Sequence, residues 1–161
     1  MERTTKERWK TVEMNRATEY MAKSNYVCSE SVLLGVCEEL GIKVDDKIIP
    51  RIGRLFAGGI GRTGSVCGAV AGGVMALGLV VEPGQTMEEG LAAMKVAEEF
   101  RRRFEAEMGG INCRDLTGLD LMTPEGMKAL MSTDTSQTVC LPAVAAAYRI
   151  VLDLVKERAT T

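Results

Sequence analysis

The feature that most constrains the fold is the glycine-rich passage over residues 55–81, which reads LFAGGIGRTGSVCGAVAGGVMALGLVV. A loop crowded with glycines and carrying Arg62 leads into an apolar segment with Cys67 near its start. Glycine lets backbone approach backbone or ligand closely, at a cost in conformational entropy. The passage therefore predicts a buried segment that needs close approach and that has a cysteine within it.

The loop contains a literal Gly-x-Gly-x-x-Gly made by Gly59, Gly61 and Gly64. A dinucleotide-binding loop of this form needs a strand before it in a βαβ unit, but the preceding IIPRIGRLFAGG has a helical and basic pattern. A phosphate-binding P-loop is rejected too, because no Gly-Lys-Ser/Thr follows. An anion beside Arg62 at the start of the next helix stays open.

Hydrophobic periodicity and capping residues predict helices over residues 5–23, 29–40, 47–56, 66–80, 86–109, 123–131 and 140–158. Ser65 is the expected N-cap of the helix at 66–80, and Thr86 with Glu89 forms a capping box. Residues 109–113 are expected to be an irregular connection. No strand or repeat is evident, so we predict a single all-α domain over residues 1–161, with six or seven helices around the buried glycine-rich one.

Three further local patterns concern two helix starts and the surface. Asp45 and Asp46 are expected to cap the helix at 47–56, and Pro124 suits the first position of the helix at 123–131. The run Arg101–Arg103 is flanked by glutamates. It is therefore interpreted as a solvated or salt-bridged face and not as a binding patch.

Composition narrows the function classes. The net charge of -2 argues against a nucleic-acid binder. Residues 1–10 are charged and lack the apolar region of a signal peptide, and residues 65–81 are too short for a membrane-spanning helix. The expectation is a cytoplasmic protein without a membrane or nucleic-acid partner.

The chain has no histidine, so a metal site would use cysteine, carboxylate or backbone ligands. In a reducing compartment structural disulfides are not expected, which gives weight to metal ligation or redox chemistry. The five cysteines are Cys28, Cys37, Cys67, Cys113 and Cys140.

All the cysteines except Cys37 fall at predicted helix starts or connectors. Unpaired N–H groups and positive potential there are expected to lower the thiol pKa and favour the thiolate. The alternative is that these cysteines are ordinary buried apolar residues, and Cys37 is interpreted in that way. Because the chain has no Cys-x-x-Cys pair, a shared site would be assembled from distant positions.

The glycine spacing Gly68-x-x-x-Gly72, continued by Gly73 and Gly78, gives the helix at 66–80 a smooth face. Tight helix–helix packing is the stronger interpretation of this face. The functional alternative is that a cofactor or the glycine loop lies directly against the backbone. A smooth face is also one that helices use against a second subunit, so a homodimer stays open.

The cysteine contexts resemble the C_GCAxxG_C_C family of redox-active proteins, found mainly in anaerobic bacteria and archaea. The resemblance runs from about residue 20 to residue 155. It rests on Asn25 before Cys28, GGIGRTGSVCGAVAGG with Cys67, INCRDL with Cys113, and Cys140. In one departure, the family label puts glycine before this cysteine, whereas here Val66 precedes Cys67 and Gly68 follows it.

The resemblance implies a small helical protein whose redox-active or metal-binding residues are Cys28, Cys67, Cys113 and Cys140. The chain is also similar to the non-haem part of split-Soret cytochrome c, for which an iron–sulfur centre has been suggested.

Three functions are compatible with these sequence features. The first is electron transfer through an iron–sulfur cluster bound by the four cysteines, with cofactor contacts from Gly59, Gly61, Arg62, Gly64 and Gly68. The second is metal-free thiol–disulfide chemistry, pairing cysteines such as Cys67 and Cys113. The third is a structural zinc site or a helical binding module. The sequence names neither the redox partner protein nor a substrate, and it leaves open whether the chain is an oxidoreductase or an electron carrier.

Overall fold

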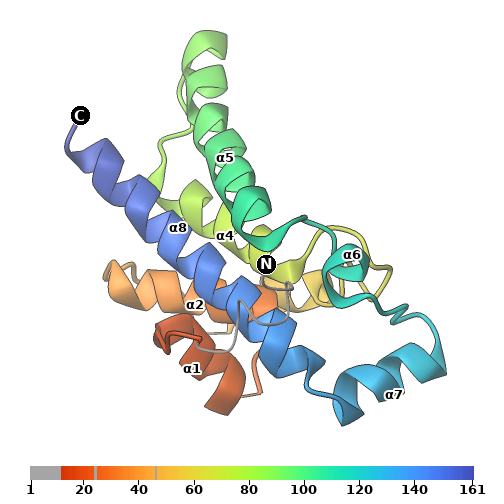
Figure 1. Ribbon diagram of the computed structural model, residues 1–161. Helices are drawn as coiled ribbons and strands as arrows, with labels where there is room; N and C mark the ends of the chain where they lie inside the picture. Colours follow the sequence, from red (N-terminus) through yellow and green to blue (C-terminus); the bar gives the residue numbers. More distant parts are fainter. Residues whose placement is uncertain (1–11, 24, 46) are drawn as a thin grey trace, which may run out of the picture.

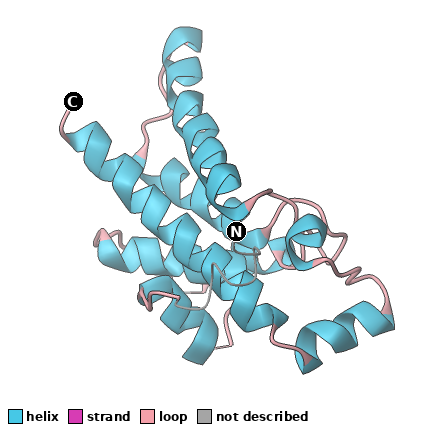
Figure 2. Cartoon of the chain, viewed as in Figure 1, coloured by secondary structure: helices cyan, strands magenta, loops and turns pink. Residues whose placement is uncertain are grey.

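The computed structural model of the protein describes residues 12–23, 25–45 and 47–161. These residues form eight α-helices and no strand, which confirms the all-α prediction (Figures 1 and 2). The helices are α1 (Arg16–Lys23), α2 (Cys28–Glu39), α3 (Ile48–Gly53), α4 (Gly68–Val80), α5 (Met87–Met108), α6 (Cys113–Thr117), α7 (Pro124–Ser132) and α8 (Leu141–Ala159). A 3₁₀ turn, Arg54–Phe56, follows α3, and a π-helical turn, Ser136–Cys140, precedes α8.

The centre of the molecule is made by α2, α4 and α8, which pack on one another. The α1 helix covers α2 and α8 on one side, and α5 lies against α4 and α8 on the other. In Figure 1, α5 extends away from this centre, whereas α6 and α7 lie to the right of it. The glycine-rich helix is thus in the core as predicted, and it shares the centre with α2 and α8.

The first predicted helix is shorter than expected. Its residues 5–11, which include Trp9, lie outside the described part, and residues 12–15 are not helical. Asn15 and Thr18 explain the later start, because Asn15 Oδ1 accepts the Thr18 N–H at 3.1 Å and Thr18 Oγ1 accepts the Asn15 N–H at 2.8 Å. This reciprocal pair caps α1 immediately before Arg16.

The prediction that Ser65 caps the glycine-rich helix is wrong. Val66 instead pairs with Asn112 in an isolated antiparallel bridge. The N–H of Cys67 donates to Ile111 O at 2.7 Å, and the N–H of Cys113 donates to Ser65 O at 2.8 Å. This pairing with a distant segment keeps residues 65 and 66 extended, so α4 begins at Gly68.

Other boundaries follow local chemistry more closely. Thr86 and Glu89 form the predicted capping box, with Thr86 Oγ1 accepting the Glu89 N–H at 3.2 Å and Glu89 Oε2 accepting the Thr86 N–H at 3.1 Å. Thr123 caps α7 by accepting the Gly126 N–H at 3.0 Å, and Pro124 opens the helix.

Two segments differ in detail from the prediction. The helix expected at 47–56 is divided into α3 and the 3₁₀ turn, and the Asp45 carboxylate accepts the Lys47 N–H at 2.8 Å just before it. Asp46 lies outside the described residues. The connection expected over 109–113 ends in the short helix α6, the element that the sequence did not predict among the eight helices of the described residues.

The smooth face of α4 is used for close packing, as the stronger interpretation held. A β-carbon built on Gly72 would lie 2.5 Å from Ser29 O in α2, and one built on Gly73 would lie 2.3 Å from Phe100 Cζ in α5. Both distances are shorter than real contacts allow, so larger residues would force α4 away from its neighbours.

In the described part of the chain, the π-helical turn and α8 together form one helix, Ser136–Ala159. This helix is long and apolar enough to span a membrane by length and composition. Half of its most apolar stretch is buried inside the protein. Core helices of globular proteins also meet these two criteria, and α8 contributes buried residues such as Val144, Ala147 and Val151 to the core.

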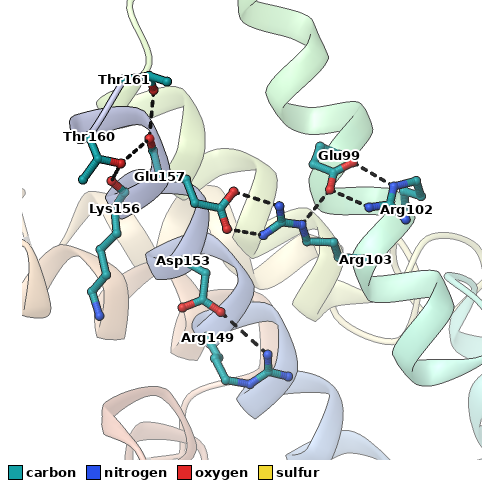
Figure 3. A network of polar contacts seen from close by, with 9 residues as sticks. All are labelled: Glu99, Arg102, Arg103, Arg149, Asp153, Lys156, Glu157, Thr160 and Thr161. Atoms are coloured by element: carbon teal, nitrogen blue, oxygen red, sulfur yellow. Dashed lines mark hydrogen bonds and ion pairs between the residues drawn. The ribbon is translucent and has the colours of Figure 1, made fainter.

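The arginine run on α5 is a salt-bridged face, as predicted (Figure 3). Glu99 accepts hydrogen bonds from Arg102 and from Arg103 Nε, the latter at 2.7 Å. Arg103 also donates two bonds to Glu157 of α8, at 2.7 and 2.8 Å. The network therefore ties α5 to α8.

This network generates a pH prediction. The bonds from Arg102 and Arg103 lower the pKa of Glu99 from about 4.5 to about 2. A carboxyl with a depressed pKa stabilises the fold above its unfolded pKa, and this stabilisation is lost as the pH falls through the window between the two values. We expect Glu99→Gln to lose part of the acid-induced drop in urea midpoint across this window. Glu98 is an exposed neighbour on α5, so Glu98→Gln is the control. If the urea midpoint of Glu99→Gln falls with pH as steeply as that of the wild-type protein, the prediction is contradicted.

Candidate functional site

A cavity of about 230 Å³ lies where α2, α4, α6 and α8 begin. Its wall contains four cysteines from four separate segments, together with mostly apolar side chains. The cysteines are Cys28, Cys67, Cys113 and Cys140. The fifth, Cys37, lies in the hydrophobic core with 2% of its surface exposed. All five lie in the described part of the chain, and none is disulfide-bonded.

The sequence predicted that the wall cysteines lie at helix starts or connectors, and three of them stand at helix starts. Cys28 is the first residue of α2, Cys67 occupies the cap position of α4, and Cys113 is the first residue of α6. Cys140 is the last residue of the π-helical turn before α8. The four cysteines therefore share one cavity because three helix starts and the turn that leads into α8 surround it.

Cys28 is seated by a glycine. A β-carbon built on Gly68 would lie 2.2 Å from Cys28 Sγ, so the sulfur occupies the space that a side chain on α4 would fill. Gly68 is also part of the cavity wall. At this position the missing side chain makes room for a thiol against the backbone of α4, whereas the sequence-based alternative placed a cofactor or the glycine loop there.

The Val66–Asn112 bridge sets Cys67 beside Cys113. Side chains alternate between the two faces of extended backbone, so the residues that follow Val66 and Asn112 direct their side chains to the same face. Both sulfurs belong to the cavity wall, and each cysteine is 8% exposed. The bridge explains how residues far apart in the sequence present two thiols together.

The π-helical turn sets the position of Cys140. Four residues spaced around this turn and the start of α8 line the cavity, namely Ser136, Val139, Cys140 and Ala143. Such turns are uncommon and occur frequently at functional sites. The change in helical geometry aims Cys140 into the wall while α8 continues through the core.

The thiols are not pre-ionised, contrary to the expectation from helix starts. Burial raises the pKa of Cys28 and of Cys67, and it raises that of Cys113 to about 11 and that of Cys140 to about 12. Neighbouring thiols add to the upward shift of Cys28, Cys113 and Cys140, since one thiolate disfavours another. The N–H groups of Ala69 and Val70 oppose the upward shift of the Cys67 pKa, but burial outweighs them. Without a bound cation, the site therefore favours neutral thiols.

The glycine loop contributes less directly than expected. Of the described loop residues, Ala57 and Gly58 line the cavity, whereas Gly59, Gly61, Arg62 and Gly64 stand outside the wall. Arg62 is exposed. The loop N–H groups bond within the loop, with Gly61 donating to Leu55 O at 2.8 Å and Gly64 donating to Gly58 O at 3.0 Å. The loop therefore contributes to the cavity wall only through Ala57 and Gly58.

Sequence reasoning missed a buried polar group next to Cys28. Glu30 is fully buried, and it accepts hydrogen bonds from the N–H of Val27 and from Arg54. Ser29 is buried too and donates from Oγ to Gly53 O at 2.6 Å. The one sequence signal was a glutamate at the third helical position, which is typical of a capping interaction. Its partner Arg54 is distant in the sequence.

The four sulfurs share a cavity, but they do not meet at a single point. Among the described residues, no three cysteine, aspartate or glutamate side chains are grouped so that they could hold one metal ion. A tetrahedral zinc site has Zn–S bonds of about 2.3 Å, which places its sulfurs about 4 Å apart. Among the described residues, the four cysteines thus line one cavity without forming a ready-made site for a single ion.

The geometry agrees with the comparison against known families. The chain belongs to the C_GCAxxG_C_C family, whose model carries the description "Putative redox-active protein (C_GCAxxG_C_C)" and matches residues 26–154. This match includes all four cysteines of the cavity wall. No curated protein and no solved structure matches the chain.

The contact between Gly68 and Cys28 generates a second prediction. In Gly68→Ala the new β-carbon must displace Cys28 Sγ, and we expect a loss of about 1–3 kcal/mol in the free energy of unfolding, typical of overpacking. Alkylation of Cys28 in the reduced, metal-free protein should become faster. Urea denaturation and peptide mass spectrometry measure the two effects.

The same helix offers a matched control. No described atom of a neighbouring segment lies within 4 Å of a β-carbon built on Gly78. Gly78→Ala should leave Cys28 unchanged and stabilise the helix by about 0.5–1 kcal/mol. Equal behaviour of the two variants would show that the contact with Cys28 is unimportant.

Proposed function

We propose that this redox-active family member is an electron-transfer protein that binds an iron–sulfur cluster through Cys28, Cys67, Cys113 and Cys140. One observation carries the proposal, namely that these four cysteines come from separate segments and line one cavity. Four cysteine thiolates are the usual ligand set of such clusters.

The size of the cavity supports a group larger than a single ion. At about 230 Å³ it exceeds the roughly 150 Å³ of an engineered apolar cavity that accommodates benzene. The side chain absent at Gly68 adds room beside Cys28. A structural zinc site would draw on the same cysteines, so the size of the cavity is the observation that favours a cluster.

The surroundings of the cysteines define what the chain itself would contribute. Apolar side chains such as Leu116, Leu121 and Val139 line the same wall and limit the access of water. The Thr117 side chain lowers the pKa of Cys113 against the larger effect of burial. When bound, a cluster would supply the capacity to take up and release an electron, and its potential depends on burial and on hydrogen bonds to sulfur.

Metal-free thiol–disulfide chemistry has weaker support. The attacking group in such chemistry is a thiolate, and burial raises the pKa of all four thiols.

The electron donor and acceptor in our proposal are other proteins in a reducing, cytoplasmic setting.

Anaerobic reconstitution tests the proposal. After incubation with iron and sulfide, we expect the protein to contain both elements and to show a visible absorbance that bleaches on reduction. Individual Cys→Ser changes at residues 28, 67, 113 and 140 should lower the iron content or alter the spectrum. Cys37→Ser is the matched control, since Cys37 is buried outside the cavity wall.

Three outcomes would contradict the cluster. A colourless, iron-free protein after reconstitution would exclude it. Stoichiometric zinc without visible absorbance would favour the structural site, and a reversible disulfide between two wall cysteines without metal would favour thiol–disulfide chemistry.

A further inference from the structure

Glu30 is a buried carboxylate in the first turn of α2, two residues after the wall cysteine Cys28. It accepts hydrogen bonds from the backbone before α2 and from Arg54. Its Oε2 accepts the backbone N–H of Val27 at 2.9 Å. Arg54 donates from Nε to Oε1 at 3.0 Å and from Nη2 to Oε2 at 3.3 Å. The carboxylate is 0% exposed, whereas the Arg54 side chain is 56% exposed.

The bond to Val27 controls how the chain enters α2. In a complete capping box, the cap residue contributes a hydroxyl and the glutamate three positions later accepts the N–H of the cap residue. Val27 has no hydroxyl, so only the half made by Glu30 is present. The direction of the backbone immediately before Cys28 therefore depends on where Arg54 holds the Glu30 carboxylate.

The pair also joins two parts of the cavity wall. Val27 and Cys28 line one part, and Ala57 and Gly58, which follow the 3₁₀ turn that contains Arg54, line another. A β-carbon built on Gly53 would lie 3.0 Å from Glu30 Cγ, so the end of α3 packs directly on this side chain. Glu30 and Arg54 thus connect the start of α2 to the start of the glycine loop.

Stability alone does not require such a pair. Replacing a buried ion pair by apolar residues of similar volume is often neutral or stabilising, whereas removing one partner leaves an uncompensated charge. A charge-assisted pair is, however, directional. Its directionality matters where a neighbouring atom must be held in one place, and Cys28 Sγ is such an atom because it is seated against Gly68.

We propose that Glu30 and Arg54 are a positioning pair that fixes the position of Cys28 relative to the other three cysteines of the cavity. The consequence for a bound cluster rests on the proposed function. The geometric part concerns the protein alone and is tested without metal.

The first experiment measures the reactivity of each cysteine in the reduced, metal-free, folded protein. N-ethylmaleimide is the probe, and peptide mass spectrometry gives a rate for each residue. Glu30→Ala and Arg54→Ala should raise the rate of Cys28 relative to Cys67 and Cys113 by about tenfold, since each removes a charge-assisted hydrogen bond. Glu30→Gln keeps an acceptor oxygen for the Val27 N–H and should have a smaller effect.

Arg103→Ala is the matched control. It removes an arginine that pairs with two glutamates, Glu99 and Glu157, and none of these three residues lines the cavity. It should lower the melting temperature without changing the ratio of Cys28 to Cys67 labelling. An unchanged ratio in Arg54→Ala, or an equal rise in Arg103→Ala, would overturn the proposal. If Glu30→Ala does not fold, Arg54→Ala decides, because its side chain is more than half exposed.

The second experiment uses the reconstituted protein. Glu30→Ala and Arg54→Ala should change the electron paramagnetic resonance line shape and speed the loss of iron, whereas Arg103→Ala should keep the wild-type spectrum. Wild-type spectra in both Glu30→Ala and Arg54→Ala would overturn the proposal. If the wild-type protein binds no iron, the proposed function fails, and the labelling ratios still decide the positioning role of the pair.

Discussion

The close approach of α4 to the start of α2 is the contact on which the site depends. It requires glycine at two successive turns of α4, because Gly72 faces the Ser29 carbonyl and Gly68 faces the Cys28 sulfur. A β-carbon at either position would separate the helices. The glycines therefore pack the core and seat a thiol with the same backbone contact.

Burial determines the charge of the group that this site can bind. The four thiols lie in mostly apolar surroundings that raise their pKa values, so four thiolates would be stable together only with a bound cation or cationic group. Metal ligation requires deprotonated cysteines and releases protons.

The parts of the structure that sequence predicts well are those fixed by neighbouring residues. Thr86 with Glu89, and Thr123 with Pro124, mark helix starts because their capping bonds span only three positions. Ser65 fails as a cap because a segment more than forty residues later pairs with Val66. The expectation that four cysteines lie at helix starts or connectors came from local sequence, and the structure places these four around one cavity. Their raised pKa values could not be predicted in this way, since burial is set by the packing of distant helices, and the Glu30–Arg54 pair was missed for the same reason.

The place of Cys140 at the entrance to α8 has a consequence for the core as well as for the site. The Val66–Asn112 bridge fixes Cys67 and Cys113 to one unit of backbone, and Cys28 is seated by α4. The fourth thiol arrives only with the helix that buries Val144, Ala147 and Val151 in the centre of the protein. The residue that completes the thiol set and the residues that complete the hydrophobic core therefore lie on one continuous stretch of helix, so a displacement of α8 would alter both together.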